Sequence, residues 1–449
     1  MGKSPQKIIN VGKLWQGDGA KVRVNAAIGL ADDEIVYIGD QAGAKKAFAN
    51  AEIVDLGNVL AIPGFVDSHC HTPMALFRGI VHTLAVAATS KESSIIEDIF
   101  FPVESHLKPQ DVEMFAYSSI IDGIKSGVTT FFDSYFFMPE FAKAFERIGA
   151  RAFVGEHIAD RGGPIPSGRD KWLATKKCIE NWPFSTRIRP MVYAHAADTV
   201  SPSLLKELSD YSIIGNLPFH MHLSQTYGER ARVLKTEGMS PVSYAESLGV
   251  LRQGAIVTHL VSADETDLKR IGDSGATVAY CPTSEIFYEA LPPIDLFDRH
   301  NIPVAIGTDC SASNDSNDIM QEMKVAAILH KKVKGTQEID PGRILASVTT
   351  IPARACGAKI GYLGEGYKAD ICFLQPDIGV MPEHNLPANL VYSYRSRHVK
   401  HVLIDGKWVL QDGIIQTVNE GDLAEKFASA FSSFVKRTSA FRSVEKYLK

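Results

Sequence analysis

The chain of 449 residues lacks the features that mark several classes of protein. It has no apolar run of about 18 residues, which argues against a membrane-spanning helix, and no signal-peptide pattern follows its first residues. Its six cysteines form no CxxC pair, as is typical of reduced thiols. The net charge of −5 offers no basic surface to nucleic acid. We therefore expect a cytoplasmic protein with a small-molecule substrate and no nucleic-acid or membrane partner.

A Gly-rich phosphate-binding loop is also missing. No GxGxxG pattern follows any strand-like segment, which argues against a doubly wound nucleotide-binding fold. Present instead are eight strand-like segments, most of them followed by a helical pattern. This alternation predicts an α/β protein with a TIM-type (β/α)8 barrel. The eight segments are 63–71, 127–133, 151–157, 188–195, 218–223, 255–260, 276–282 and 303–309.

Both ends of the chain differ from the middle, because they consist of short strands and Gly/Asp-rich turns. We predict that residues 1–58 and 362–420 form one small β-sandwich domain together, and that residues 59–361 form the barrel. Two helical stretches, over 317–331 and over 340–356, would close the barrel. The tail, 421–449, has apolar residues at helical spacing and is expected to form a helix that packs on its own domain or on a sister subunit. These apolar residues are Leu423, Phe427, Phe431, Phe434 and Phe441.

Polar residues gather at the carboxyl ends of the barrel segments. The first segment ends in His69-Cys70-His71, and alternate residues of a strand point the same way, so both imidazoles project together. Taken singly, each histidine fits a core or surface position equally well. In a barrel, however, the strand ends converge on one mouth, where active sites lie. A metal site is therefore predicted at this mouth. The other candidates at strand ends are His195, His222, His259 and Asp309.

The residues at these strand ends also indicate how many metal ions bind and which element they are. His220 shares a strand face with His222 but lies one pleat repeat deeper, so we take His222 as the ligand and His220 as an interior or supporting residue. Three histidines and one aspartate suit Zn(II), with Fe(II) as the alternative. A carboxylated lysine could bridge a second metal, but the fourth segment ends in Tyr193-Ala194-His195. One divalent metal is therefore expected.

The segments that hold these residues match one family pattern. They are PGFVDSHCH (63–71), SGVTTFFD (126–133), HLSQT (222–226), the strand ending at His259, CPTS (281–284) and GTDCSASND (307–315). With them the chain resembles the amidohydrolase superfamily, in the mononuclear branch that holds cytosine, guanine and S-adenosylhomocysteine deaminases and triazine chlorohydrolases. The resemblance implies a metal held by His69, His71, His222 and Asp309.

The resemblance also implies roles for individual residues. Asp309 would double as the base that takes a proton from the metal-bound water. His259 would orient this water or polarise the scissile bond, and His195 would contact the substrate. Barrels of this family often pair, so a homodimer is expected.

Two positions depart from the family pattern. Deaminases of this branch have Glu three residues after the fifth-strand His, where it protonates the substrate ring. This chain has Gln225 there, which cannot deliver a proton. The usual Asn after CPTS is Glu285 here. We place Gln225 among the catalytic residues and Glu285 among the substrate contacts, the alternative for Glu285 being an exposed loop carboxylate.

These residues predict a metal-dependent hydrolase of a non-peptide C–N bond, or a related C–X bond. Metal-bound hydroxide would attack an amide, urea or carbamate in a small molecule, because these carbonyls need no acid at the position of Gln225. The alternative is a heteroaromatic deaminase or triazine-type chlorohydrolase that tolerates Gln225. A non-catalytic binding relative is the distant alternative, against which the intact ligand set argues.

Overall fold

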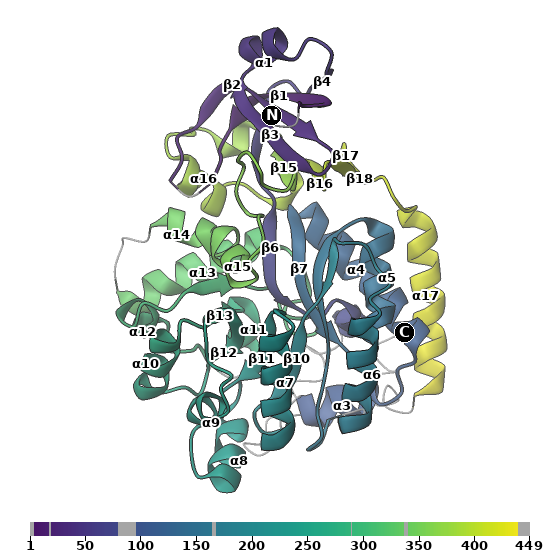
Figure 1. Cartoon of the computed structure of the whole chain (residues 1–449), viewed down its shortest axis with the longest axis vertical. Coiled ribbons are helices and arrows are strands. Elements are labelled where there is room, and N and C mark those ends of the chain that lie inside the picture. The colour runs from purple at the N-terminus through teal and green to yellow at the C-terminus, as the bar shows by residue number, and fades with distance from the viewer. Residues whose placement is uncertain are drawn as a thin grey trace.

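The computed structural model describes residues 4–438, except Asp18, 80–95, 164–167, Glu289 and 336–339. Figure 1 shows a small domain of strands at one end of the long axis and a larger α/β domain below it, with helix α17 running along one side. Both chain ends contribute to the small domain, and the larger domain holds alternating strands and helices. The predicted fold class is thereby confirmed.

The larger domain is built on a ring of parallel strands. Two parallel sheets, β6-β7-β8-β9 and β10-β11-β12-β13-β14, are joined by bridges between Cys70 and Asp309 and between Ile158 and Ala194. Only Met191 separates β9 from β10, so these two are pieces of one strand and the ring is the eight-stranded barrel that the sequence predicts. The strands are β6 (Phe65–Cys70), β7 (Val128–Tyr135), β8 (Arg151–Glu156), β9 (Ile188–Pro190), β10 (Val192–Ala196), β11 (Phe219–Leu223), β12 (Ala255–His259), β13 (Thr277–Tyr280) and β14 (Val304–Ile306).

Helices connect these strands and lie outside the ring. The helix predicted over 340–356 is in fact two helices, α14 and α15. Between them, the carbonyl of Ser347 accepts a hydrogen bond from the backbone N–H of Ile306. The carbonyl of Val348 accepts one from Val66, so the chain leaves the helical path to support β14 and β6. The helices are η1 (Thr72–Phe77), η2 (Ile96–Phe100), α3 (Phe101–Glu104), α4 (Pro109–Lys125), α5 (Met138–Ile148), α6 (Gly168–Glu180), α7 (Pro202–Ile214), α8 (Tyr227–Glu237), α9 (Pro241–Ser247), α10 (Glu265–Ser274), α11 (Pro282–Tyr288), α12 (Ile294–Arg299), α13 (Ile319–Lys334), α14 (Pro341–Ala346) and α15 (Thr350–Ala355).

Burial explains why these segments take these forms. Every residue of β7 is buried, as expected for a parallel strand that is covered on both faces. Helix α5 buries Phe141, Phe145 and Ile148, which recur at helical spacing. It ends at Gly149, whose φ of 88° is a left-handed conformation that glycine adopts readily. The apolar pattern of the sequence thus places these elements around one core.

The small domain contains both ends of the chain, as predicted. Its strands form one sheet in the order β18-β17-β16-β15-β5-β1-β2-β3, with β4 paired to β1. Strands β5 and β15 are antiparallel neighbours from opposite ends of the sequence, and Ile28, Ile371 and Phe373 belong to a core that is separate from the barrel core. Its elements are β1 (Lys7–Leu14), β2 (Arg23–Ala31), β3 (Glu34–Asp40), α1 (Gln41–Ala47), β4 (Glu52–Asp55), β5 (Leu60–Pro63), β15 (Ile371–Leu374), η3 (Ile378–Val380), η4 (Ser396–His398), β16 (Val399–Ile404), β17 (Lys407–Gln411) and β18 (Ile414–Ile415). Helix α16 (Leu386–Tyr392) lies between β15 and β16 in sequence but packs on α13 and α14 of the larger domain.

A buried ion-pair cluster joins the two domains. Arg151 begins barrel strand β8, and its Nε donates to Asp370 at 2.6 Å. The same guanidinium donates to Asp405, which follows β16. All three side chains are buried. The cluster lies at the amino-terminal side of the barrel strands, so the carboxyl ends of the strands face away from the small domain.

The tail forms helix α17 (Glu420–Arg437), which packs on the barrel of its own chain. Phe434 is fully buried, and the rings of Phe427 and Phe434 lie 5.2 and 5.9 Å from Phe115 of α4. Within the described residues, the apolar face of α17 thus contacts α4 of the same chain. Phe441 lies outside the described residues.

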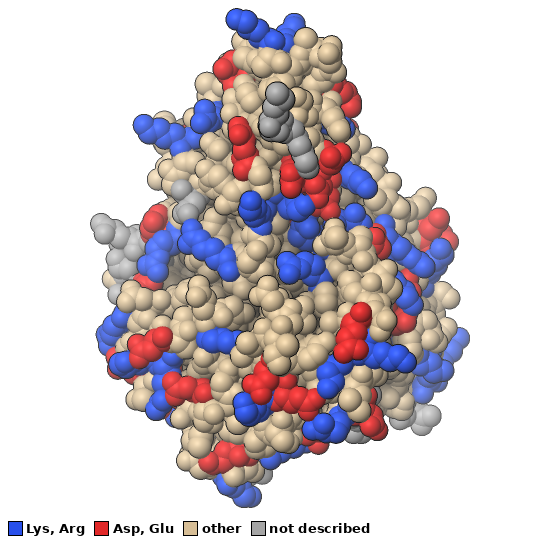
Figure 2. All heavy atoms as spheres, viewed as in Figure 1, with Lys and Arg blue, Asp and Glu red and all other residues tan. Residues whose placement is uncertain are grey.

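Charged side chains are spread over the visible face of the molecule. Acidic and basic side chains are interspersed over both domains in Figure 2. Within the part of the chain that the structure describes, no helix has both the length and the apolar character needed to cross a membrane. The six cysteines are free, in agreement with the prediction of reduced thiols.

Candidate metal centre

The barrel brings the predicted polar residues together at the carboxyl ends of its strands. The backbone of β6 continues into a ladder with the chain after β14: Asp309 N–H donates to the His69 carbonyl, and His71 N–H donates to the Asp309 carbonyl. Gly307 permits this approach, because a Cβ there would lie 2.7 Å from the His69 carbonyl oxygen. Residues 240 positions apart in sequence are thereby side by side.

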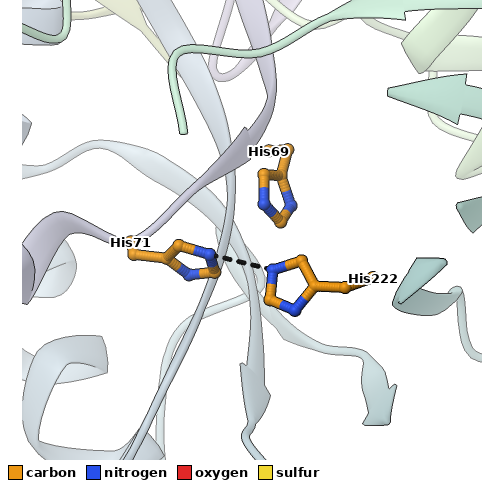
Figure 3. A group of neighbouring side chains, drawn as sticks. All are labelled: His69, His71 and His222. Carbon is orange, nitrogen blue, oxygen red and sulfur yellow. Dashed lines mark hydrogen bonds between the residues drawn. The ribbon is translucent and has the colours of Figure 1, made fainter. Parts of the chain in front are cut away.

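Four side chains meet at this point. The Nε2 atoms of His71 and His222 are 3.2 Å apart, and Asp309 Oδ1 lies 3.5 Å from the Nε2 atoms of both His69 and His71. Figure 3 shows the three imidazoles turned toward one another. Nitrogens that share one tetrahedral zinc ion at about 2.0–2.1 Å are about 3.3 Å apart. The observed spacings therefore suit one metal ion.

The hydrogen bonds of these residues also fit a divalent metal. His71 Nδ1 donates to the Ser134 carbonyl at 2.6 Å, which leaves Nε2 as an acceptor facing the cluster. Buried His69 Nε2 has no hydrogen-bond partner among the described residues, although its Nδ1 lies 3.1 Å from His220 Nε2. An unpartnered buried nitrogen of this kind is costly unless a ligand satisfies it. His220, which the sequence places one pleat repeat deeper than His222, lies beside the Nδ1 atom of His69.

The charge state of the cluster favours metal binding. Burial lowers the pKa of His69 to about 3 and lowers the pKa values of His71 and His222, so all three imidazoles are neutral at pH 7. Burial alone would raise the pKa of Asp309, but the imidazoles of His69, His259 and His71 around its carboxylate hold that pKa below its usual value. Neutral imidazoles and an ionised carboxylate are the forms that ligate a divalent cation.

Two buried carboxyl groups, which the sequence analysis passed over, support the strand ends. Asp67 accepts hydrogen bonds from the backbone N–H and the hydroxyl of Thr308 at 3.0 and 2.6 Å, and Asp133 accepts from the backbone N–H and the hydroxyl of Thr72. Burial raises their pKa values to about 7 and about 8. Both lie in the motifs PGFVDSHCH and SGVTTFFD, and that position was the only signal of their importance.

His259 and Glu285 lie beside the cluster. One ring nitrogen of His259 lies within 4.8 Å of ligand atoms of His69 and Asp309. Glu285 Oε1 is 3.6 Å from His259 Nδ1. The alternative of an exposed loop carboxylate for Glu285 is wrong, because its side chain is only 1% exposed. The backbone turns sharply at His259 and at Asp309. Their φ values of 82° and 59° are strained for residues other than glycine.

A pocket opens on the metal cluster. Glu285 is not among the described residues that line it, whereas Gln225 and His195 are. His195 Nδ1 lies 2.8 Å from Thr199 Oγ1, and burial lowers the pKa of His195 to about 4. The described lining consists of His71, Met74, Ile96, Phe100, Phe101, Glu104, Phe136, His157, His195, His222, Gln225, Asp309 and Cys310.

Two polar residues of this pocket were missed by the sequence analysis. His157 follows the third strand, and its ring lies 5.2 Å from that of His71 and 5.3 Å from that of His195. The end of the strand was the signal that could have found it. Glu104 follows no barrel strand directly. It is buried, accepts a hydrogen bond from the Tyr135 hydroxyl at 2.6 Å, and has its pKa raised to about 7 by burial.

The fold and the site together define a metal-dependent hydrolase on a (β/α)8 barrel. The model of the amidohydrolase family matches residues 60–409, and the chain belongs to this family. It is accordingly a metal-dependent amidohydrolase that acts on carbon–nitrogen bonds, as the sequence analysis predicts.

Individual relatives are similar over nearly the whole chain. A 5-methylthioadenosine/S-adenosylhomocysteine deaminase of Syntrophobacter fumaroxidans is 32% identical over 411 residues, covering 89% of this chain and 91% of the relative. A 5'-deoxyadenosine deaminase of Methanocaldococcus jannaschii is 32% identical over 395 residues, covering 85% and 90%. The crystal structure of an adenosine deaminase from Xanthomonas campestris with bound zinc is 25% identical, with a TM-score of 0.88, covering 96% of this chain and 99% of that one. These relatives favour the deaminase alternative over hydrolysis of an amide, urea or carbamate.

Proposed function

We propose that the chain is a zinc-dependent deaminase of an adenosine-type nucleoside, in which water replaces the exocyclic amine of a purine ring. The observation that supports this most directly is the meeting of three neutral imidazoles and one ionised carboxylate at the floor of a half-apolar pocket. The relatives point to the substrate class, since their names specify 5-methylthioadenosine, S-adenosylhomocysteine and 5'-deoxyadenosine.

In this proposal each residue of the cluster has its own role. The metal, Zn(II) by the chemistry of the donor set with Fe(II) as the alternative, supplies an acidic water as nucleophile when bound. Asp309 is both ligand and base, because its ionised carboxylate can accept a proton from that water. One ring nitrogen of His259 lies close to the ligand atoms of His69 and Asp309. The proposed ligands are His69, His71, His222 and Asp309.

The pocket side chains would bind the ring. Gln225 can donate and accept hydrogen bonds with a ring nitrogen and an amine through its carboxamide. His195 is neutral because burial lowers its pKa to about 4, so it can hydrogen-bond another ring nitrogen without repelling the metal. Phe100, Phe101 and Phe136 provide apolar walls for a flat heterocycle.

Glu104 gives a pH-dependent prediction. Its pKa of about 7 means that the carboxyl is protonated below pH 7 and ionised above it. We propose that Glu104, which lines the pocket, faces the sugar of the bound nucleoside. Its carboxylate would then accept hydrogen bonds from the sugar hydroxyls, so KM for a nucleoside should fall as pH rises through about 7. A hydrogen bond to a charged group contributes about 1.5–3 kcal/mol, so Glu104→Gln should raise KM about 10- to 100-fold at pH 8. Initial-rate kinetics from pH 6 to about 9 measure this. A KM profile shared by the wild type and Glu104→Gln would contradict it.

One observation favours a second function. Gln225 cannot protonate a ring nitrogen, whereas attack on a carbonyl needs no acid at that position. Hydrolysis of a small amide, urea or carbamate is therefore the other candidate.

The deciding experiment is a screen of the zinc-loaded protein for ammonia release. The panel comprises 5-methylthioadenosine, S-adenosylhomocysteine, adenosine and 5'-deoxyadenosine on one side, and amides, ureas and carbamates on the other. We expect turnover of at least one nucleoside with kcat/KM above about 10⁴ M⁻¹s⁻¹, an ordinary enzymatic value. Turnover confined to the second group would replace the proposal with the second candidate.

A further inference from the structure

Glu285 is a buried carboxyl that the proposed reaction has not yet used. It lies in the first turn of α11, where its Oε1 accepts a hydrogen bond from the backbone N–H of Cys281 at 3.1 Å. The same Oε1 is 3.6 Å from His259 Nδ1, and Oε2 has no hydrogen-bond partner among the described residues. Burial of a carboxylate in this way costs free energy unless a positively charged group or a hydrogen-bond donor pairs with it. Its close partner is the imidazole of His259.

The other side of His259 faces the metal cluster. The His259 ring lies 5.5 Å from that of His69 and 5.3 Å, stacked, from that of His222. Because Nδ1 faces Glu285, Nε2 is the nitrogen left for the cluster, and this buried Nε2 has no hydrogen-bond partner among the described residues. His259 thus stands between a fixed carboxylate and the point where the reacting atoms would meet.

The carboxylate of Glu285 can favour only one of the two tautomers of His259. An ionised carboxylate only accepts hydrogen bonds, so it selects the tautomer of His259 with hydrogen on Nδ1 and a lone pair on Nε2. The amide found at this position in the family pattern could donate to Nδ1 and select the opposite tautomer. We propose, on the basis of the proposed deaminase function, that Glu285 is a positioning residue that makes His259 Nε2 the proton shuttle of a site in which Gln225 cannot transfer a proton.

The proton balance of the proposed step is complete. The water oxygen forms a bond to the ring carbon, and one proton of the water moves to His259 Nε2. That proton passes to the exocyclic amine, the C–N bond breaks, and ammonia leaves. The second proton of the water leaves through Asp309 and ends on the ring nitrogen of the product, with no oxidant or reductant involved. Burial raises the pKa of Glu285 and its contact with His259 opposes that rise; as a carboxylate, Glu285 stabilises the transient imidazolium, as the buried carboxylate does in Ser-His-Asp triads.

The test compares Glu285→Gln with the wild type in two independent readouts. In the zinc-loaded protein labelled with 15N-histidine, the His259 ring signals are assigned by their loss in His259→Asn. We expect the wild-type signals to report hydrogen on Nδ1 and those of Glu285→Gln to report hydrogen on Nε2. In kinetics, kcat should fall about 10²- to 10⁴-fold, the range of a misplaced acid–base group, while KM changes less than about threefold. Glu285→Asp should recover part of kcat, and Gln225→Glu should recover part of it in the Glu285→Gln background.

The controls separate this inference from the proposed function. Ile286→Gln changes the next residue of α11, which is 49% exposed, and should leave both readouts unchanged. Zinc content and the unfolding midpoint, measured for each variant, exclude metal loss or misfolding as the cause of a low kcat. An unchanged tautomer in Glu285→Gln, or a kcat within threefold of the wild type, overturns the inference. If no nucleoside is turned over, the proposed function fails, and the NMR result still decides whether Glu285 sets the tautomer of His259.

Discussion

Replacement of Asp309 by Asn should lower kcat/KM by about 10⁴-fold or more. A positioned base alone contributes about 10²- to 10⁴-fold. Asp309 is also a proposed metal ligand, since its Oδ1 lies 3.5 Å from the Nε2 atoms of both His69 and His71. The asparagine keeps the shape of the side chain but has neither the charge of a ligand nor the basicity of a proton acceptor. Steady-state kinetics with the substrate found in the screen, together with zinc analysis by mass spectrometry, measure the effect.

Asp318→Asn is the matched control for this substitution. Asp318 lies nine residues further along the same segment and caps α13 by accepting hydrogen bonds from the N–H groups of Met320 and Gln321. Asparagine is an equally good N-cap, so this variant should keep both activity and zinc. Activity above about one per cent in Asp309→Asn with a full equivalent of zinc would contradict the role of Asp309 as base.

Replacement of Arg151 by Met should destabilise the protein by about 3–5 kcal/mol, the usual cost of removing one partner from a buried ion pair. Arg151 is 6% exposed and holds the carboxylates of Asp370 and Asp405 at the junction of the two domains. Methionine fills a similar volume but leaves both carboxylates buried without a cation. Urea unfolding followed by circular dichroism gives the change in free energy.

Two further variants show whether charge is the cause. Arg187→Met removes a partly exposed arginine that pairs with Glu146, and it should cost less than about 1 kcal/mol. Adding Asp370→Asn and Asp405→Asn to Arg151→Met should restore most of the lost stability, because no unpaired buried charge remains. If the triple variant is as unstable as Arg151→Met, lost packing rather than charge explains the effect.

The sequence predicted the barrel and most of the cluster because both depend on local periodicity. His69 and His71 share a strand face by the alternation of a β-strand. Once eight parallel strands are recognised, their carboxyl ends must converge, so His222, His259 and Asp309 could be grouped without coordinates. The preference for a substrate outside heteroaromatic rings rested on Gln225 alone, and the relatives, named as deaminases of adenosine-type nucleosides, weigh against it.

Other features depended on contacts that leave no periodic signal. Glu104 reaches the pocket from a short helix after β6 and not from a strand end. Glu285 lies in what reads as a polar loop segment, and only the three-dimensional fold brings its carboxyl to 3.6 Å from Nδ1 of His259. The helix predicted over 340–356 is interrupted because the carbonyls of Ser347 and Val348 accept hydrogen bonds from distant strands.

The sequence by itself therefore determined the architecture and the place where the proposed metal ligands gather, because strand alternation and parallel convergence follow from covalent geometry and local patterns. Only the tertiary structure decided which further side chains surround that centre. Whether Glu285 meets His259 or solvent, and whether Glu104 enters the pocket, depends on how elements far apart in sequence pack together. That packing sets the burial and the hydrogen bonds of each group, and these in turn set its protonation state and the reaction it can assist.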